Sequence, residues 1–69
     1  MRYFSLEGSI PSVLREDGKA FIWAKSKGVW GEISARELLA DTRTPELTRS
    51  EFDNDLAVAG IDPKTLDDL

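Results

Sequence analysis

Residues 12–25 read SVLREDGKAFIWAK, in which Asp17-Gly18 separates two apolar runs. An Asp-Gly pair between such runs is the strongest short-range signal for a β-hairpin, because a type I′ turn needs positive φ at both of its central residues. The stretch therefore predicts two antiparallel strands joined at Asp17-Gly18, and the rest of the fold is built outward from them.

The predicted register divides the hairpin side chains between two faces. With Asp17-Gly18 as the two loop residues, Leu14 lies opposite Phe21 and Val13 lies opposite Ile22. Successive residues of a strand point to opposite sides of the sheet. One face then carries Leu14, Phe21 and Trp23, and the other carries Val13, Ala20, Ile22 and Ala24.

Two further strands flank this hairpin. Residues 3–6 read as a short strand, and residues 8–12 read as the break after it. A turn over residues 26–28 leads into residues 29–33, which complete an antiparallel meander. A turn loop of two residues or of three places Trp30 on opposite faces, and both alternatives stay open.

The second half of the chain carries two helix-start signals. Ser34-Ala35-Arg36-Glu37 and Thr48-Arg49-Ser50-Glu51 are both capping boxes, in which two side chains accept hydrogen bonds from backbone N–H groups at the helix start. The first helix should run to about Asp41 and end before Pro45, because proline disfavours helical geometry in the residue before it.

The second helix is expected over residues 49–59. Its apolar stripe is formed by Phe52, Leu56 and Ala59, and Gly60 supplies the C-cap. A final turn or two opens at Asp62-Pro63, an N-cap followed by proline at the first helical position.

These elements predict one small α+β domain over residues 1–69. Residues 1–33 form the sheet, an antiparallel meander of three or four strands. Residues 34–69 form the helical part, with two or three short helices packed on one face of the sheet.

The composition excludes several classes of site. The chain has 69 residues without Cys or His, which rules out disulfides, Cys/His zinc sites and imidazole catalysis. Asp53-Asn54-Asp55 resembles the start of a calcium loop, but Val58 and Lys64 stand where glycine and a carboxylate are needed. We expect no catalytic residue, no metal and no cofactor, and thus a protein that is not an enzyme.

Charge is unevenly distributed along the chain. Residues 1–33 hold five basic and four acidic groups, whereas residues 34–69 hold four and nine. A nucleic-acid binder needs a basic face to displace counterions, so nucleic acid is an unlikely partner. No apolar run is long enough for a membrane span, no small-molecule ligand is indicated, and a chain without cysteine suits the cytoplasm.

The sheet itself is the predicted binding surface. Both predicted faces are apolar, but the predicted helices can cover only one of them. The other should be covered by the N-terminal strand and its loop, by a second copy of the chain in a homodimer, or by another protein. The leading function is a regulatory or protein-interaction module; the alternative is a nucleic-acid-associated regulator that uses the basic, aromatic sheet. The candidate partner-binding residues are Leu14, Phe21, Trp23 and Trp30.

Several of these motifs together carry a family resemblance. They are residues 13–20 (VLREDGKA), Trp23, residues 28–30 (GVW), residues 38–39 (LL) and residues 47–51 (LTRSE). The pattern resembles short uncharacterised proteins of actinobacteria and their phages, which share the initial Met-basic-aromatic strand, the Arg-x-Asp-Gly hairpin, the tryptophan strand and the Thr/Ser-x-x-Glu helix. The resemblance implies a bacterial protein of the same fold outline and transfers no functional residue.

Overall fold

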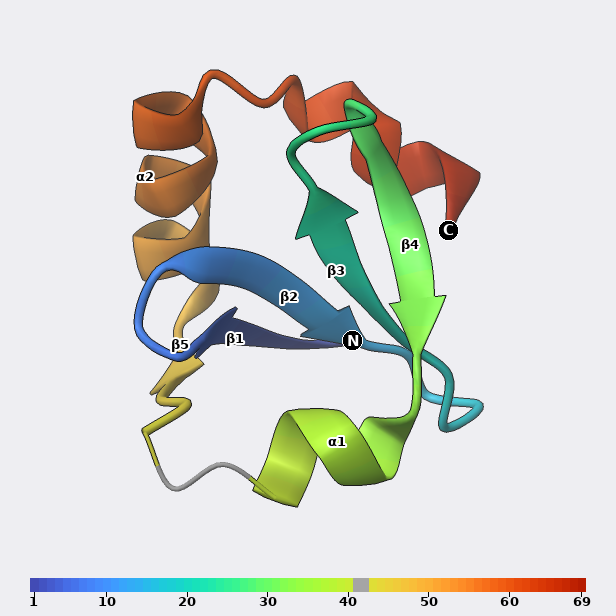
Figure 1. Ribbon diagram of the computed structural model, residues 1–69. Helices are drawn as coiled ribbons and strands as arrows, with labels where there is room; N and C mark the ends of the chain where they lie inside the picture. Colours follow the sequence, from blue (N-terminus) through green and yellow to red (C-terminus); the bar gives the residue numbers. More distant parts are fainter. Residues whose placement is uncertain (41–42) are drawn as a thin grey trace.

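The computed structural model describes residues 1–40 and 43–69, which form an α+β fold around one antiparallel sheet (Figure 1). The five strands, in the spatial order β4-β3-β2-β1-β5, are β1 (Arg2–Leu6), β2 (Ile10–Leu14), β3 (Ala20–Ala24), β4 (Val29–Ile33) and β5 (Glu46–Leu47). The helices are α1 (Ala35–Ala40), α2 (Arg49–Ala59) and the 3₁₀ helix η1 (Pro63–Asp68). The α+β class is confirmed.

The sheet is a meander of β1 to β4 with one strand added from the second half of the chain. β5 pairs antiparallel with β1, with Tyr3 opposite Leu47. The Arg2 guanidinium holds the Glu46 carboxylate in a bidentate pair, with N···O distances of 3.0 and 2.8 Å. A three- or four-stranded sheet confined to residues 1–33 was therefore an incomplete prediction, because a two-residue strand has no periodicity to reveal it.

The predicted register of the β2–β3 hairpin was wrong by one residue. Val13 lies opposite Phe21, and Leu14 lies opposite Ala20. The prediction had paired Val13 with Ile22 and Leu14 with Phe21. A one-residue slip moves each side chain of a strand to the other face relative to its partner. Val13 therefore shares a face with Phe21, whereas Leu14 points to the opposite face.

The hairpin loop explains this slip. It contains three residues, 16–18, rather than two, and the Gly18 N–H donates to the Arg15 carbonyl at 3.0 Å. Gly18 has φ +88° but Asp17 does not have positive φ, so a type I′ turn at these two residues is excluded. The geometry is that of a three-residue loop in which a left-handed glycine follows the turn.

The turn between β1 and β2 has positive φ at two successive residues, the feature that the sequence predicted for Asp17-Gly18. Glu7 and Gly8 both have positive φ, at 54° and 78°, as the central residues of a type I′ turn require. β2 begins directly after this turn at Ile10. The predicted break over residues 8–12 is therefore too long, and Pro11 lies inside a strand.

The β3–β4 turn settles the face of Trp30. Ala24 is the last residue of β3 and lies opposite Val29, so the loop has four residues, 25–28, and both predicted lengths, two and three residues, were wrong. Trp23 then lies opposite Trp30. Both tryptophans thus belong to the same face, whereas the sequence had left that face open.

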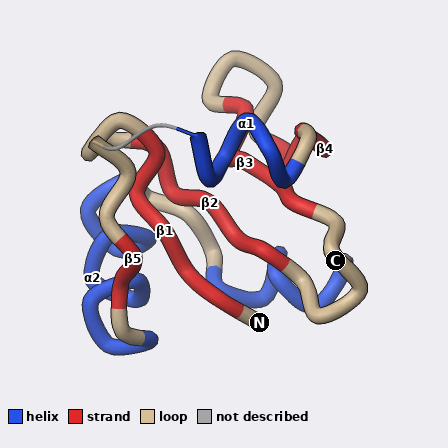
Figure 2. Tube along the Cα trace, turned by 90° about the horizontal axis from the view of Figure 1, so that it is seen from below, coloured by secondary structure: helices blue, strands red, loops and turns tan. Residues whose placement is uncertain are grey.

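The three helices lie on both faces of the sheet, so the prediction of helices on a single face was wrong. Figures 1 and 2 show α1 apart from α2 and η1. We call the two sides the α2 face and the α1 face. The α2 face carries Tyr3, Val13, Phe21, Trp23, Trp30 and Leu47, which pack with residues of α2 and η1. The α1 face carries Phe4, Leu6, Leu14, Ala20 and Ile33, which pack with Leu38 of α1.

α2 begins and ends where its capping residues predict. The Thr48 hydroxyl accepts from the Glu51 N–H at 3.2 Å, and the Glu51 carboxylate accepts from the Thr48 N–H at 2.9 Å. Gly60 has φ +73° and ends the helix. The buried stripe contains Phe52 and Leu56, but Ala59 is exposed, contrary to the prediction, because the chain turns away at Gly60.

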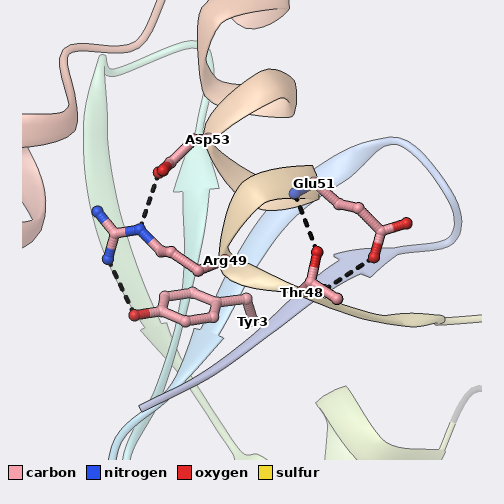
Figure 3. A network of polar contacts seen from close by, with 5 residues as sticks. All are labelled: Tyr3, Thr48, Arg49, Glu51 and Asp53. Atoms are coloured by element: carbon pink, nitrogen blue, oxygen red, sulfur yellow. Dashed lines mark hydrogen bonds and ion pairs between the residues drawn. The ribbon is translucent and has the colours of Figure 1, made fainter.

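A polar network holds the start of α2 against β1 (Figure 3). The Arg49 guanidinium donates to the Tyr3 hydroxyl at 2.9 Å and to the Asp53 carboxylate at 2.8 Å. The Tyr3 ring packs on Phe52 with a centroid separation of 4.7 Å. These contacts join the first turn of α2 to β1 and to the buried ring of Phe52.

The cap predicted for η1 is confirmed, whereas the capping box predicted at Ser34–Glu37 forms only in part, because Ser34 caps the N–H of Arg36 and, within the described residues, Glu37 makes no bond back to Ser34. The Ser34 hydroxyl accepts from the Arg36 N–H at 3.1 Å at the start of α1. The Asp62 carboxylate accepts from the Lys64 N–H at 2.9 Å at the start of η1. The predicted end of the first helix at Asp41 lies outside the described residues.

Candidate functional site

The tryptophan pair lies near the end of the sheet where α2 and η1 approach β3 and β4. The Trp23 and Trp30 rings meet edge to face, with centroids 5.3 Å apart and an interplanar angle of 72°. This is a favoured geometry for an aromatic pair, because the positive ring edge meets the negative ring face. The pair therefore forms one aromatic unit across β3 and β4.

Trp30 is the anchored member of the pair. Its indole N–H donates to the Thr65 hydroxyl at 2.9 Å, which ties β4 to η1. Its ring lies 6.4 Å from the Phe52 ring of α2, measured between centroids. Trp30 is thus fixed by both of the helices that cover the α2 face.

Trp23 differs from Trp30 in its hydrogen bonding. It is half-buried, and its indole N–H donates to no acceptor within the described residues. Since a buried Trp N–H normally finds a partner, a Trp with an unused donor at the surface is able to donate to a ligand. The two tryptophans consequently differ in what they can do.

Two hollows open on either side of Trp23, which lines both of them. The larger, which we call the η1 hollow, has a volume of about 480 Å³ and is lined by Phe21, Trp23, Gly28, Val29, Trp30, Thr65, Asp68 and Leu69. The smaller, the α2 hollow, has a volume of about 280 Å³ and is lined by Ser9, Ile10, Pro11, Trp23, Lys25, Val58 and Ala59. Trp23 is therefore a ridge between two neighbouring hollows, and the three together form what we call the tryptophan cleft.

Strand pairing explains why the α2 hollow exists. The ladder between β2 and β3 includes only residues 12–14 of β2. The next residue, Pro11, has no N–H and cannot donate a ladder hydrogen bond. The strands therefore separate between Pro11 and Trp23, and the space is left for side chains that α2 does not fill.

The rims of the cleft carry exposed apolar and charged groups. Val29 in the η1 hollow is 52% exposed, and Val58 in the α2 hollow is 82% exposed. A valine this exposed on a helix contributes little to the core, so Val58 is available to a partner. Asp68 lines the η1 hollow and Lys25 lines the α2 hollow, so opposite charges mark the two ends of the cleft.

The structure brings together three of the four predicted partner-binding residues. Phe21, Trp23 and Trp30 all line the η1 hollow. Leu14 does not belong to this site, because the corrected hairpin register turns it to the α1 face, where it packs near Leu38. The sequence analysis did not identify Val58. Its position in the second helix, outside the Phe52-Leu56 stripe, would have indicated an exposed apolar side chain.

A third hollow, of about 320 Å³, lies beside the β2–β3 loop. It is lined by Met1, Arg15, Glu16 and Asp17. Its charged groups already pair with one another: the Arg15 guanidinium lies 3.0 Å from the Asp17 carboxylate, and the Met1 amine lies 3.6 Å from the Glu16 carboxylate. This hollow offers a ligand fewer unpaired groups than the tryptophan cleft.

The shifted carboxylate pKa values are explained by structural contacts away from the cleft. The hydrogen bond from the Thr48 backbone N–H lowers the pKa of Glu51. The hydrogen bond from the Arg2 guanidinium likewise lowers the pKa of Glu46. Across residues 1–40 and 43–69, no group of three or more acidic side chains is placed to hold a metal ion. Over the same residues, no helix is long and apolar enough to cross a membrane.

No protein-family model, curated protein or solved structure matches this chain. The resemblance to actinobacterial and phage proteins stays a prediction. The functional argument therefore rests on the tryptophan cleft.

Proposed function

We propose that this protein is a non-catalytic interaction module that holds an extended segment of another protein in the tryptophan cleft. The observation that carries the proposal is the position of Trp23, whose half-buried ring lines both hollows and whose N–H has no acceptor among the described residues. Tryptophan is among the residues that contribute most to binding energy at protein interfaces, because it combines a large apolar area with a polar donor.

The apolar rims favour a protein ligand. Phe21, Trp23 and Trp30 line the η1 hollow, and Trp23 and the exposed Val58 line the α2 hollow, so apolar side chains are present in both. Exposed apolar side chains that gather around a hollow are typical of interaction sites. A segment lying across Trp23 would remove these surfaces from water and give the free indole N–H a carbonyl acceptor.

A nucleic-acid ligand is the weaker alternative. Lys25 and the nearby Lys27 lie beside the cleft, but Asp68 lines its larger hollow and would repel phosphate. Because the chain has net charge −4, we expect oligonucleotides at about 150 mM salt to bind no tighter than the non-specific range of roughly 10⁻⁴ to 10⁻⁶ M. Fluorescence anisotropy measures this directly.

A peptide-display selection on the immobilised protein tests the proposal. The selection is run in parallel on the parent protein, on Trp23→Ser and on Val58→Lys, with Leu39→Lys as the matched control. Leu39 is 51% exposed on α1 and lines none of the three hollows described above. Circular dichroism first establishes that each variant folds; Val58→Lys keeps the test valid even if Trp23→Ser unfolds the chain.

The outcomes separate the proposal from its competitors. We expect peptides that bind the parent and the Leu39→Lys variant but not the cleft variants. Failure to enrich any cleft-dependent peptide would overturn the proposal. Light scattering that shows a dimer of the parent and a monomer of Trp23→Ser would assign the cleft to a second copy of the chain instead. We place the module in the cytoplasm, in keeping with its lack of cysteine.

A further inference from the structure

We propose that the segment held by the cleft is a proline-containing polyproline II stretch with a basic side chain directed into the η1 hollow. This inference rests on the proposed function and adds the chemical class of the partner. It is argued from the shape of the cleft, from the free donor on its ridge and from the charges at its two ends.

The shape of the cleft suits a polyproline II ligand. An aromatic ridge with a hollow on either side receives a ligand that projects apolar groups in front of and behind the ridge. A polyproline II helix repeats every three residues with a rise of about 3.1 Å per residue, so it presents apolar rings at regular steps along one side. An amphipathic helix needs one continuous groove for anchors at positions i, i+3, i+4 and i+7, and Trp23 interrupts such a groove.

The unused donor on Trp23 matches the same ligand. A polyproline II backbone makes no internal hydrogen bonds, so its carbonyl groups are available as acceptors along the whole segment. The Trp23 indole is half-buried and has no acceptor within the described residues, while the Trp30 indole is already bound to Thr65. One hydrogen bond from the Trp23 indole N–H to a ligand carbonyl would thus give this donor an acceptor.

The charges at the ends of the cleft orient the ligand. Asp68 lines the η1 hollow, and Asp67 precedes it on the exposed side of η1. Lys25 lines the α2 hollow at the other end. A basic side chain of the ligand is therefore favoured at the η1 end and disfavoured at the α2 end, since complementary charges fix the register of a complex.

Fluorescence anisotropy with defined peptides tests this inference. The probe is a fluorescein-labelled peptide of proline and leucine residues with one arginine near one end. Two companion peptides replace the prolines by glycine or the arginine by glutamate. The protein variants are Trp23→Ser, Val58→Lys, Asp68→Lys and Asp68→Asn, with Glu37→Lys as the control for the charge change. Glu37 is exposed on α1 and lines neither hollow of the cleft.

We expect the proline-arginine peptide to bind at least about tenfold more tightly than its glycine counterpart, which must lose more conformational freedom on binding. Trp23→Ser and Val58→Lys should weaken it by a similar factor. Asp68→Lys should weaken the arginine peptide and strengthen the glutamate peptide, Asp68→Asn should have the same effects to a smaller degree, and Glu37→Lys should change neither.

Equal affinity for the proline and glycine peptides would overturn the inference, as would arginine binding that is insensitive to Asp68. The display selection keeps the two proposals apart. Cleft-dependent peptides that lack proline would leave the interaction module standing and remove only the polyproline II partner. If no cleft-dependent peptide is found, both proposals fall.

Discussion

The two faces of the sheet differ in the kind of side chain that is left half-buried. On the α1 face, a helix of six residues contributes one fully buried side chain, Leu38, which packs with the buried Phe4 and Ala20. The half-buried residues around them are aliphatic: Leu6, Leu14 and Ile33. On the α2 face, two helices share the cover, and the half-buried residues there are aromatic: Tyr3, Phe21, Trp23 and Trp30.

Side-chain size accounts for this difference. Ala20 leaves room for a single leucine, so a short helix is enough to fill the centre of the α1 face. Aromatic rings bury 150–250 Å² each in a typical protein, and tryptophan is rarely buried completely. A domain of 69 residues has little further chain with which to enclose four of them. The candidate binding site therefore lies where the core is left incomplete.

The largest effect should come from the centre of the α2 face. Phe52→Ala removes a ring that is fully buried and packs on Tyr3 and Trp30. Large-to-small changes at such positions cost about 3–5 kcal/mol, which approaches the whole stability of so small a domain. We expect the variant to be largely unfolded by far-UV circular dichroism. A cooperative denaturant melt close to that of the parent would show that α2 does not organise this face.

The next effect tests the α1 face. Leu38→Ala should lower the free energy of unfolding by about 3 kcal/mol, because Leu38 is 0% exposed and the cavity left behind cannot collapse fully. Its neighbour Leu39 is 51% exposed and serves as the matched control. If Leu38→Ala and Leu39→Ala give equal urea midpoints, α1 does not cover the sheet.

A smaller effect is expected at the start of α2. Thr48→Ala removes the hydroxyl that accepts from the Glu51 N–H and should cost about 1 kcal/mol, whereas Thr48→Ser should cost little. Urea melts of both variants against the parent measure the difference. Coincident curves for all three proteins would contradict the role of this cap.

The smallest effect is a pH dependence at the edge of the α1 face, where Glu46 lies opposite Phe4. The Arg2 hydrogen bond lowers the pKa of Glu46 in the folded protein, so the ionised carboxylate stabilises the link between β1 and β5. This contribution is complete above the unfolded glutamate pKa of about 4.3 and is lost as the pH falls through the lower folded value.

Urea melts between about pH 6 and pH 3 should therefore show a slightly larger loss of stability for the parent than for Glu46→Gln. The variant keeps a hydrogen-bonding oxygen but has no charge to lose. Parallel losses in the two proteins would show that the Arg2–Glu46 pair contributes nothing measurable to stability.

The residues of the candidate site were only partly predictable from the sequence. Like the faces of the sheet, the site depends on strand register and on contacts between residues far apart in the chain. The aromatic residues Phe21, Trp23 and Trp30 stand out in the sequence as the largest side chains near a predicted turn. Leu14 looked equivalent to them, and only the register of the hairpin separates it from the cleft. Val58 and Asp68 come from helices distant in sequence, so nothing local predicts that they reach the same cleft.

The boundaries of α2 were determined by the sequence alone, because a cap needs only groups within a few residues of one another. Thr48, Glu51 and Gly60 define both ends of α2 without help from the rest of the chain. The faces of the sheet were decided by tertiary contacts. Asp17-Gly18 fits either a two-residue or a three-residue loop, and the choice between them depends on which register lets Val13 meet Phe52 and Leu14 approach Leu38. Those contacts join residues far apart in the chain, and their free energy exceeds the small preference of one turn for another.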